Sequence, residues 1–277
     1  MKLGTVDTPQ GAIAVVERDG AFRRLESSVL ELLRSGPEAL AEAASRATEP
    51  VSFTDADLLP VIPDPGKILC VGRNYLEHVE ELGNKVTKSP EIFVRTPTTL
   101  ARPYGPVINP KLSDRFDWEV ELAVVIGRAG RHIAPEDAYH HVAGYTIFND
   151  FTARDYQRRT TQWTPGKNFD QTGPLGPYLV TSDEIPDPSG LDISLTIDGE
   201  QMQHSNTRML IHSVPALIAF LSSFATLLPG DVIATGTPGG VGDGRDPKVF
   251  LRSGQVVVST IEGLGELRNV VEDEVAG

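Results

Sequence analysis

Two glutamates separated by one residue form the clearest chemical signal in this sequence. The segment 117–127 carries the apolar run of a buried strand around Glu119 and Glu121. Alternation along such a strand puts both carboxylates on one face and Val120 and Leu122 on the other. Burial of two neighbouring carboxylates costs several kcal/mol per ion unless something compensates their charge. A hard divalent cation would do so, because Mg²⁺, Mn²⁺ and Ca²⁺ prefer carboxylate oxygens.

Asp150 is the candidate third ligand for such a cation. It follows the apolar stretch 142–148 and precedes the polar stretch 152–158, so it lies at a predicted strand-to-helix edge. A side chain at such an edge can point into a cleft. Three carboxylates would leave coordination positions for water and substrate, as a catalytic metal requires. The residues alone leave a second interpretation open, in which the glutamates form a solvated face paired with lysines.

A histidine and a glutamate form the second candidate cluster. The pattern of residues 70–81 predicts a strand, a glycine turn and a helix, on which His78 and Glu81 share one face. A carboxylate beside an imidazole orients the ring and raises its basicity, so this pair could deprotonate a water molecule. The alternative is a surface pair that only stabilises a short helix.

Strands are the main elements that must position these residues. Hydrophobic patterning predicts strands at 68–72, 91–95, 118–126, 142–149, 176–181, 191–198, 231–235 and 255–261. It predicts helices at 75–82, 135–141, 152–159 and 214–224. Asp198-Gly199 is typical of a hairpin turn. The chain is therefore predicted to be mainly β with some α (α+β), without a regular βαβ alternation.

Residues 1–60 are predicted to form a small N-terminal α+β domain. Short strands are expected at 2–6 and 11–16, followed by a helical segment at 28–47 that breaks near Gly36-Pro37. The three prolines within 60–66 indicate a linker. Residues 61–277 then form the catalytic domain.

Charge and composition exclude several classes of partner. A net charge of −13 repels nucleic acid and anionic membranes, and no run of 18 apolar residues could span a bilayer. The single cysteine, Cys70, lies in an apolar segment and is expected to be a buried space-filler. With no disulfide and no signal-peptide pattern, we expect a cytoplasmic protein. A small anionic substrate would need a local cation, such as a metal, to reverse the field.

Seven segments in a fixed order carry a family resemblance. They are 71–75 with His78 and Glu81, 117–121, 149–157, 166–170, 173–177, 206–209 and 230–238. Across about residues 67–270 they resemble the fumarylacetoacetate hydrolase family, and more closely its short acylpyruvase-like branch. The resemblance implies the mixed β-sandwich or β-roll fold of that family's C-terminal domain, and a homodimer. Residues 1–60 match only loosely.

The resemblance also implies roles for individual residues. Metal ligation falls to Glu119, Glu121 and Asp150, and activation of water to His78 and Glu81. Stabilisation of the developing oxyanion falls to Lys167 and Gln157. Substrate contact falls to Arg73, Tyr75 and Thr237. The implied cofactor is Mg²⁺ or Mn²⁺, or Ca²⁺ in crystals, because three carboxylates suit these ions.

The activity implied is hydrolysis of a carbon–carbon bond in an acylpyruvate-type (1,3-diketo, 2-oxo) acid. The substrate would be a small 2-oxo acid whose enolate the metal chelates while activated water attacks the distal carbonyl. The same electron sink would serve an oxaloacetate decarboxylase, or a hydroxymuconate-type isomerase or decarboxylase of aromatic catabolism. A metal-free binding protein is a further hypothesis, which the presence of all five polar positions disfavours.

Overall fold

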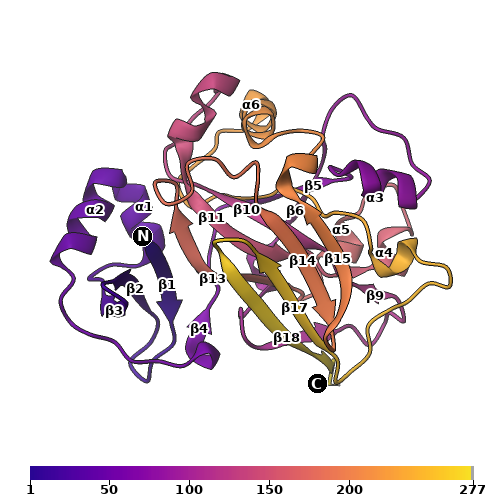
Figure 1. Cartoon of the computed structure of the whole chain (residues 1–277), viewed down its shortest axis with the longest axis horizontal. Helices are drawn as coiled ribbons and strands as arrows, with labels where there is room; N and C mark the ends of the chain where they lie inside the picture. Colours follow the sequence, from indigo (N-terminus) through magenta and orange to yellow (C-terminus); the bar gives the residue numbers. More distant parts are fainter. Residues whose placement is uncertain (276–277) are drawn as a thin grey trace.

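Two sheets packed face to face form the body of the computed structural model, which describes residues 1–275 (Figure 1). The larger sheet runs through β3 (Ala21–Arg24), β2 (Ile13–Arg18), β1 (Lys2–Val6), β13 (Gly173–Thr181), β11 (Val142–Asn149), β10 (Val120–Ile126), β16 (Val232–Ala234), β5 (Ile68–Gly72) and β6 (Glu91–Arg95). Two short strands lie off this path: β4 (Leu58–Leu59) pairs with β1, and β7 (Leu100–Ala101) pairs with β13. Neither sheet closes into a barrel.

The second sheet has five strands and covers one face of the first. Its order is β15 (Glu200–Asn206), β14 (Asp192–Ile197), β17 (Val256–Ile261), β18 (Gly265–Asp273) and β8 (Pro106–Asn109). A two-stranded ladder joins β9 (Phe116–Asp117) to β12 (Thr152–Ala153), next to the start of β10. The expected mixed β-sandwich of the α+β class is therefore confirmed.

Short helices connect the strands. They are α1 (Val29–Ser35), α2 (Pro37–Arg46), α3 (Leu76–Glu81), α4 (Arg154–Gln157), α5 (Thr164–Lys167) and α6 (Val214–Phe224). Single 3₁₀ segments occur at η1 (Asp55–Asp57), η2 (Pro97–Thr99), η3 (Pro135–His141), η4 (Thr207–Met209) and η5 (Gly242–Gly244). In Figure 1, α1 and α2 lie at one end of the molecule, and α3, α4 and α5 gather at the other.

Alternation along β10 divides the core into two layers. Val120, Leu122 and Val124 pack with apolar residues of the five-stranded sheet, whereas Ala123 and Val125 pack on the opposite side. Every residue of β10 is buried, so the polar side chains on it cannot reach bulk water. The strand therefore forces any carboxylate on its second face into the protein interior.

The N-terminal strands continue the large sheet. β1 pairs antiparallel with β13, with Leu3 opposite Leu179, and Leu3 packs in the same cluster as core residues of β10 and β11. The break of the helix at Gly36-Pro37 is confirmed, since α1 ends at Ser35 and α2 begins at Pro37. The division into domains 1–60 and 61–277 stays a prediction, but the two parts share one hydrogen-bonded sheet.

Two helix predictions are wrong in detail. At 152–159 the chain first pairs as β12 with Asp117 and Phe116, and the helix is limited to α4. Tertiary pairing has overridden local propensity there. At 135–141 the structure has a 3₁₀ segment rather than an α-helix. Among the described residues, no helix is both long and apolar enough to cross a membrane.

The core position of Leu122 makes a direct stability prediction. Its side chain is fully buried on the face of β10 opposite Glu121. Leu122→Ala should lower the free energy of unfolding by about 2–5 kcal/mol, because truncation removes apolar contacts and leaves a cavity. The matched control is Leu112→Ala at an exposed site, expected within about 0.5 kcal/mol of wild type. Urea titration measures both, and equal losses would contradict the assignment of β10 to the core.

Candidate metal centre and active site

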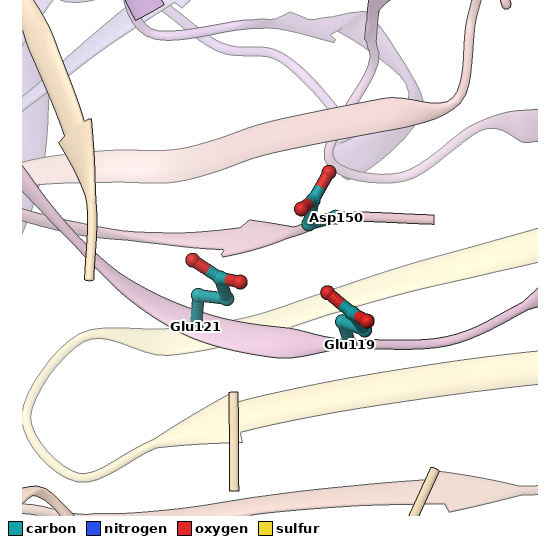
Figure 2. A group of neighbouring side chains, drawn as sticks. All are labelled: Glu119, Glu121 and Asp150. Carbon is teal, nitrogen blue, oxygen red and sulfur yellow. The ribbon is translucent and has the colours of Figure 1, made fainter. Parts of the chain in front are cut away.

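Three buried carboxylates meet where β10 begins and β11 ends. One oxygen from each of Glu119, Glu121 and Asp150 lies within 4.8 Å of the other two. Glu121 lies opposite Phe148 in the ladder, and the backbone N–H of Asp150 donates to the carbonyl of Glu119 (2.8 Å). Residues opposite each other in an antiparallel pair share a face, so all three side chains project to the same side. Figure 2 shows their carboxylates turned toward a common space.

Three cations neutralise most of this negative charge. The Lys167 ammonium lies 2.7 Å from Glu119 and 2.6 Å from Asp150. Arg154 Nη1 lies 2.6 Å from Glu119, and Arg95 is paired with Asp150 through Nη1. All three cationic side chains are buried. Removal of either member of such a buried pair would leave an uncompensated charge in the interior.

Glu121 is the member of the group that has no such partner. It accepts a hydrogen bond from the backbone N–H of Gly236 (2.8 Å), and within residues 1–275 no salt bridge joins it to a lysine or arginine. Burial, together with the charges of Asp150 and Glu119, raises the pKa of Glu121 well above its usual range. A divalent cation would supply the missing positive charge, and the all-oxygen donor set suits Mg²⁺ or Mn²⁺. The residues therefore fit the predicted metal.

The other two pKa shifts follow from the same ion pairs. Burial raises the pKa of Glu119, but Lys167 and Arg154 outweigh it and bring the pKa down to about 2. Burial lowers the pKa of Lys167, and the carboxylates of Asp150 and Glu119 outweigh it, so the pKa rises. Lys167 and Glu119 are therefore both charged at neutral pH.

A cavity of about 220 Å³ opens onto this centre. It is lined by Val71, Gly72, Arg73, His78, Leu82, Asn84, Phe93, Glu119, Glu121, Arg154, Gln157, Arg158, Trp163, Lys167 and Thr237. His78 reaches it from α3, and its Nδ1 lies 2.7 Å from Glu81 Oε1. With Glu81 ionised, Nδ1–H donates to the carboxylate and Nε2 is left as the ring nitrogen for proton transfer. The structure thus brings the predicted His78–Glu81 pair and the metal ligands together.

Three further predicted site residues line the same cavity. Gln157 accepts a hydrogen bond from Arg154 (3.2 Å), and Thr237 accepts one from the Gln203 amide (2.9 Å). Arg73 is paired with Glu91 through Nε and Nη2, so its guanidinium is already held in place. All three are at hand to contact a bound molecule, and their roles stay predictions.

Tyr75 lies outside the cavity lining. Its side chain is completely buried, and its hydroxyl has no hydrogen-bond partner among the described residues. Burial, followed by the charges of Glu121 and Glu77, raises the pKa of the hydroxyl. Tyr75 is the N-cap residue of α3, and its contact with a substrate stays a prediction.

Sequence reasoning did not find Arg95 or Asp117. Arg95 ends β6 and donates to Thr172 (2.6 Å) as well as pairing with Asp150. Asp117 is completely buried and accepts a hydrogen bond from Arg154 Nε (2.7 Å). The available signal was a charged residue directly after apolar residues at the end of a strand, Val94 before Arg95 and Phe116 before Asp117. Such a residue is rarely buried without a charged partner.

Known proteins resemble this chain over most of its length. Residues 67–272, which include every candidate ligand and the His78–Glu81 pair, match the family model described as fumarylacetoacetate (FAA) hydrolase C-terminal. The chain is 43% identical over 251 residues to the mitochondrial oxaloacetate tautomerase of Rattus norvegicus, an alignment that covers 89% of this chain and 80% of that protein. The family resemblance inferred from the seven segments is thereby confirmed.

Solved structures share the fold over nearly the whole chain. The fumarylacetoacetate hydrolase of psychrophilic Exiguobacterium antarcticum has a TM-score of 0.86 at 34% identity, covering 99% of this chain and 100% of that chain. The 5-carboxymethyl-2-hydroxymuconate delta-isomerase of Mycobacterium smegmatis has a TM-score of 0.78 at 35% identity, covering 100% of both chains. Hydrolases and isomerases are thus both among the proteins that resemble this one.

Removal of the Glu121 charge should weaken metal binding. Glu121→Gln keeps the size of the side chain but removes a charged oxygen ligand, so we expect the Kd for Mn²⁺ to rise by more than about tenfold, given that even indirect partners of a metal contribute 10–100-fold. Isothermal titration calorimetry measures the Kd. The control is Glu136→Gln on the exposed part of η3, which should bind like wild type. Unchanged binding by Glu121→Gln would exclude this centre.

Removal of the Lys167 charge should destabilise the metal-free protein. Lys167→Met leaves Glu119 and Asp150 buried with less compensation, so the free energy of unfolding without metal should fall by about 3–5 kcal/mol. Saturating Mn²⁺ should restore more stability to the variant than it adds to wild type, because the cation binds the folded state. Urea titrations with and without Mn²⁺ measure this. A metal-free variant as stable as wild type would contradict the charge balance described above.

Proposed function

This chain belongs to the fumarylacetoacetate hydrolase family of enzymes, and from that membership we propose that it isomerises small 2-oxo dicarboxylic acids. The reaction moves a proton between carbon and oxygen beside the 2-oxo group, as in interconversion of the keto and enol forms of oxaloacetate. One observation carries the proposal: a buried acidic triad suited to a divalent cation shares a cavity with a carboxylate-oriented histidine.

The charge of the cavity supports an anionic substrate. The whole chain carries −13, yet four cationic side chains line the cavity, those of Arg73, Arg154, Arg158 and Lys167. Each of these cations is ion-paired with a carboxylate, so a divalent cation bound at the acidic triad would make the local field positive. The cavity would then attract a small anion that the rest of the surface repels. A volume of about 220 Å³ is below that of typical drug-sized ligand sites, roughly 300–1,000 Å³. Both properties favour a compact diacid.

The cation held by Glu119, Glu121 and Asp150 would supply Lewis-acid polarisation of the 2-oxo group when bound. His78 carries the proton between the carbon next to that group and the oxygen of the group. Glu81 holds the imidazole through Nδ1 and stabilises its charged form. Lys167 lies where it can hydrogen-bond an oxygen that gains negative charge. Arg73 and Arg158 provide positive charge for the distal carboxylate.

Two relatives support proton transfer in particular. The rat relative is described as an oxaloacetate tautomerase, and the Mycobacterium smegmatis neighbour as a hydroxymuconate isomerase. Both descriptions are of reactions that shift a proton without breaking a carbon–carbon bond. The rat relative is described as mitochondrial, and that description concerns the rat protein alone. A cytoplasmic location of this chain stays a prediction.

Hydrolysis of acylpyruvates is the second candidate. The pair formed by His78 and Glu81 favours it, because a histidine with an oriented ring can equally take a proton from water. Hydroxide would then attack the distal carbonyl, and the carbon–carbon bond would break. Decarboxylation of oxaloacetate needs no activated water and so depends less on His78.

An assay of three reactions on the Mn²⁺-loaded enzyme tests these alternatives: isomerisation of oxaloacetate, its decarboxylation, and hydrolysis of an acylpyruvate. We expect the highest kcat/KM for conversion of oxaloacetate enol to the keto form, which is measured by the absorbance of the enol. We also expect activity to be lost on chelation of the metal. His78→Ala should lower kcat by about 10²–10⁴-fold, the usual contribution of a general base. The control is His140→Ala, at an exposed position of η3, which should leave kcat unchanged.

The outcome for the other two reactions separates the candidates. A higher kcat/KM for an acylpyruvate would replace isomerisation by hydrolysis. Decarboxylation that survives in His78→Ala while isomerisation is lost would confirm the role of His78 in proton transfer. Oxaloacetate isomerisation that is unaffected by His78→Ala would exclude the proposal.

A further inference from the structure

The glycine-rich loop 239–244 touches the carboxylate that orients the histidine. The backbone N–H of Gly240 donates to Glu81 Oε2 at 2.7 Å, while Glu81 Oε1 lies 2.7 Å from His78 Nδ1. Each oxygen of Glu81 therefore has its own partner, one from the loop and one from the imidazole. A carboxylate held at both oxygens cannot rotate away from the ring without loss of a hydrogen bond.

The glycines allow this close approach. A Cβ on Gly244 would lie 2.8 Å from Glu81 Oε2 and Cδ, and a Cβ on Gly240 would lie 2.2 Å from the carbonyl of Met202. Gly240 also has φ +102°, in the region that favours glycine. A side chain at Gly240 would clash with backbone, and one at Gly244 would displace the Glu81 carboxylate, so the backbone of the loop forms one wall around that carboxylate.

Asp117 attaches this loop to the metal centre. Its carboxylate accepts hydrogen bonds from the backbone N–H groups of Gly242 (2.7 Å) and Asp243 (3.0 Å). It also accepts one from Arg154 Nε (2.7 Å), whose Nη1 pairs with Glu119 (2.6 Å). A continuous series of short polar contacts thus runs from the metal ligand Glu119 to the loop.

The same loop reaches the cavity at a second point. Asp243 is paired with Arg158, which lines the cavity, and with Lys248 (2.7 Å). Within the loop, the carbonyl of Gly240 accepts a hydrogen bond from Nε1 of Trp118 (3.2 Å), the residue before Glu119. Charged and polar groups therefore fix the loop on the metal-centre side, while the N–H of Gly240 donates to Glu81.

We propose that loop 239–244 positions the proton-transfer pair relative to the metal centre, with Asp117, Gly240 and Gly244 as positioning residues. Asp117 fixes the loop against Arg154, the Gly240 N–H fixes Glu81, and Glu81 fixes the His78 ring. This inference rests on the proposed function, because it takes His78 as the group that moves the proton. None of the three residues touches the substrate.

Gly244→Ala is the sharpest test, because it acts on Glu81 alone. The nearest atoms to the added Cβ belong to the end of a flexible side chain, so the fold should tolerate it while the carboxylate shifts. We expect kcat to fall by about tenfold to 10²-fold, the effect of misplacing a catalytic group by about 1 Å. KM and the Kd for Mn²⁺ should stay near wild type. The control, Gly190→Ala, has no atom within 4 Å of its Cβ and should change none of these.

A double-mutant cycle separates positioning from general damage. In Glu81→Gln, the carboxylate that the loop positions is already lost, so adding Gly244→Ala should cause little further loss of kcat. Losses that multiply in the double variant would overturn the inference, since Gly244 would then act through something other than Glu81.

A nuclear magnetic resonance measurement tests the loop without turnover. In metal-free wild type, the His78 ¹⁵N shifts should report a proton on Nδ1, and Gly244→Ala should shift that resonance while Gly190→Ala leaves it in place. An unchanged resonance in Gly244→Ala would overturn the inference. If wild type catalysed none of the three reactions, the proposed function would fail, and this resonance would still decide whether the loop positions Glu81.

Discussion

Mutual repulsion of three buried carboxylates is the constraint on which the rest of the structure depends. Glu119, Glu121 and Asp150 place oxygens within 4.8 Å of one another in the interior, where each unpaired ion would cost several kcal/mol. Lys167 and two arginines offset most of that cost. Because the protein cations leave Glu121 without a charged partner among the described residues, a bound cation would offset the remaining negative charge. The stability and the chemistry of the centre therefore have the same origin.

The sheet explains how such a site stays in place. Val120 and Leu122 lie in a core that continues into the five-stranded sheet, so the strand between them cannot turn without breaking that packing. Close packing of this kind holds Glu119 and Glu121 on one face. The proposed proton-transfer pair is attached differently. His78 comes from α3, a helix of six residues, which contacts loop 239–244 through Glu81, contacts β15 through Glu77, and buries Val79.

Contacts that follow from the repeat of a strand or a helix could be predicted from the sequence. Contacts between residues far apart in the chain could not. Alternation predicted the face of Glu119 and Glu121, and helical spacing predicted the pair of His78 with Glu81. Arg95 reaches Asp150 across 55 positions, and no local pattern announces such a contact. The strand β18 was missed for a similar reason. Asn269 interrupts the apolar alternation of β18, yet it is buried, because its amide donates to a backbone carbonyl of another segment (3.0 Å).

This division also explains how one fold can serve both hydrolases and isomerases. The candidate metal ligands lie on β10 and beside the ends of β10 and β11, and the other face of β10 forms the core. The proposed proton-transfer group, His78, lies on a short helix at the cavity wall, where a small shift would decide whether it faces a substrate carbon or a water molecule. Water at that position favours hydrolysis, and its exclusion favours proton return to carbon or oxygen. Reaction type should therefore vary through α3 and loop 239–244, while the acidic centre stays constant.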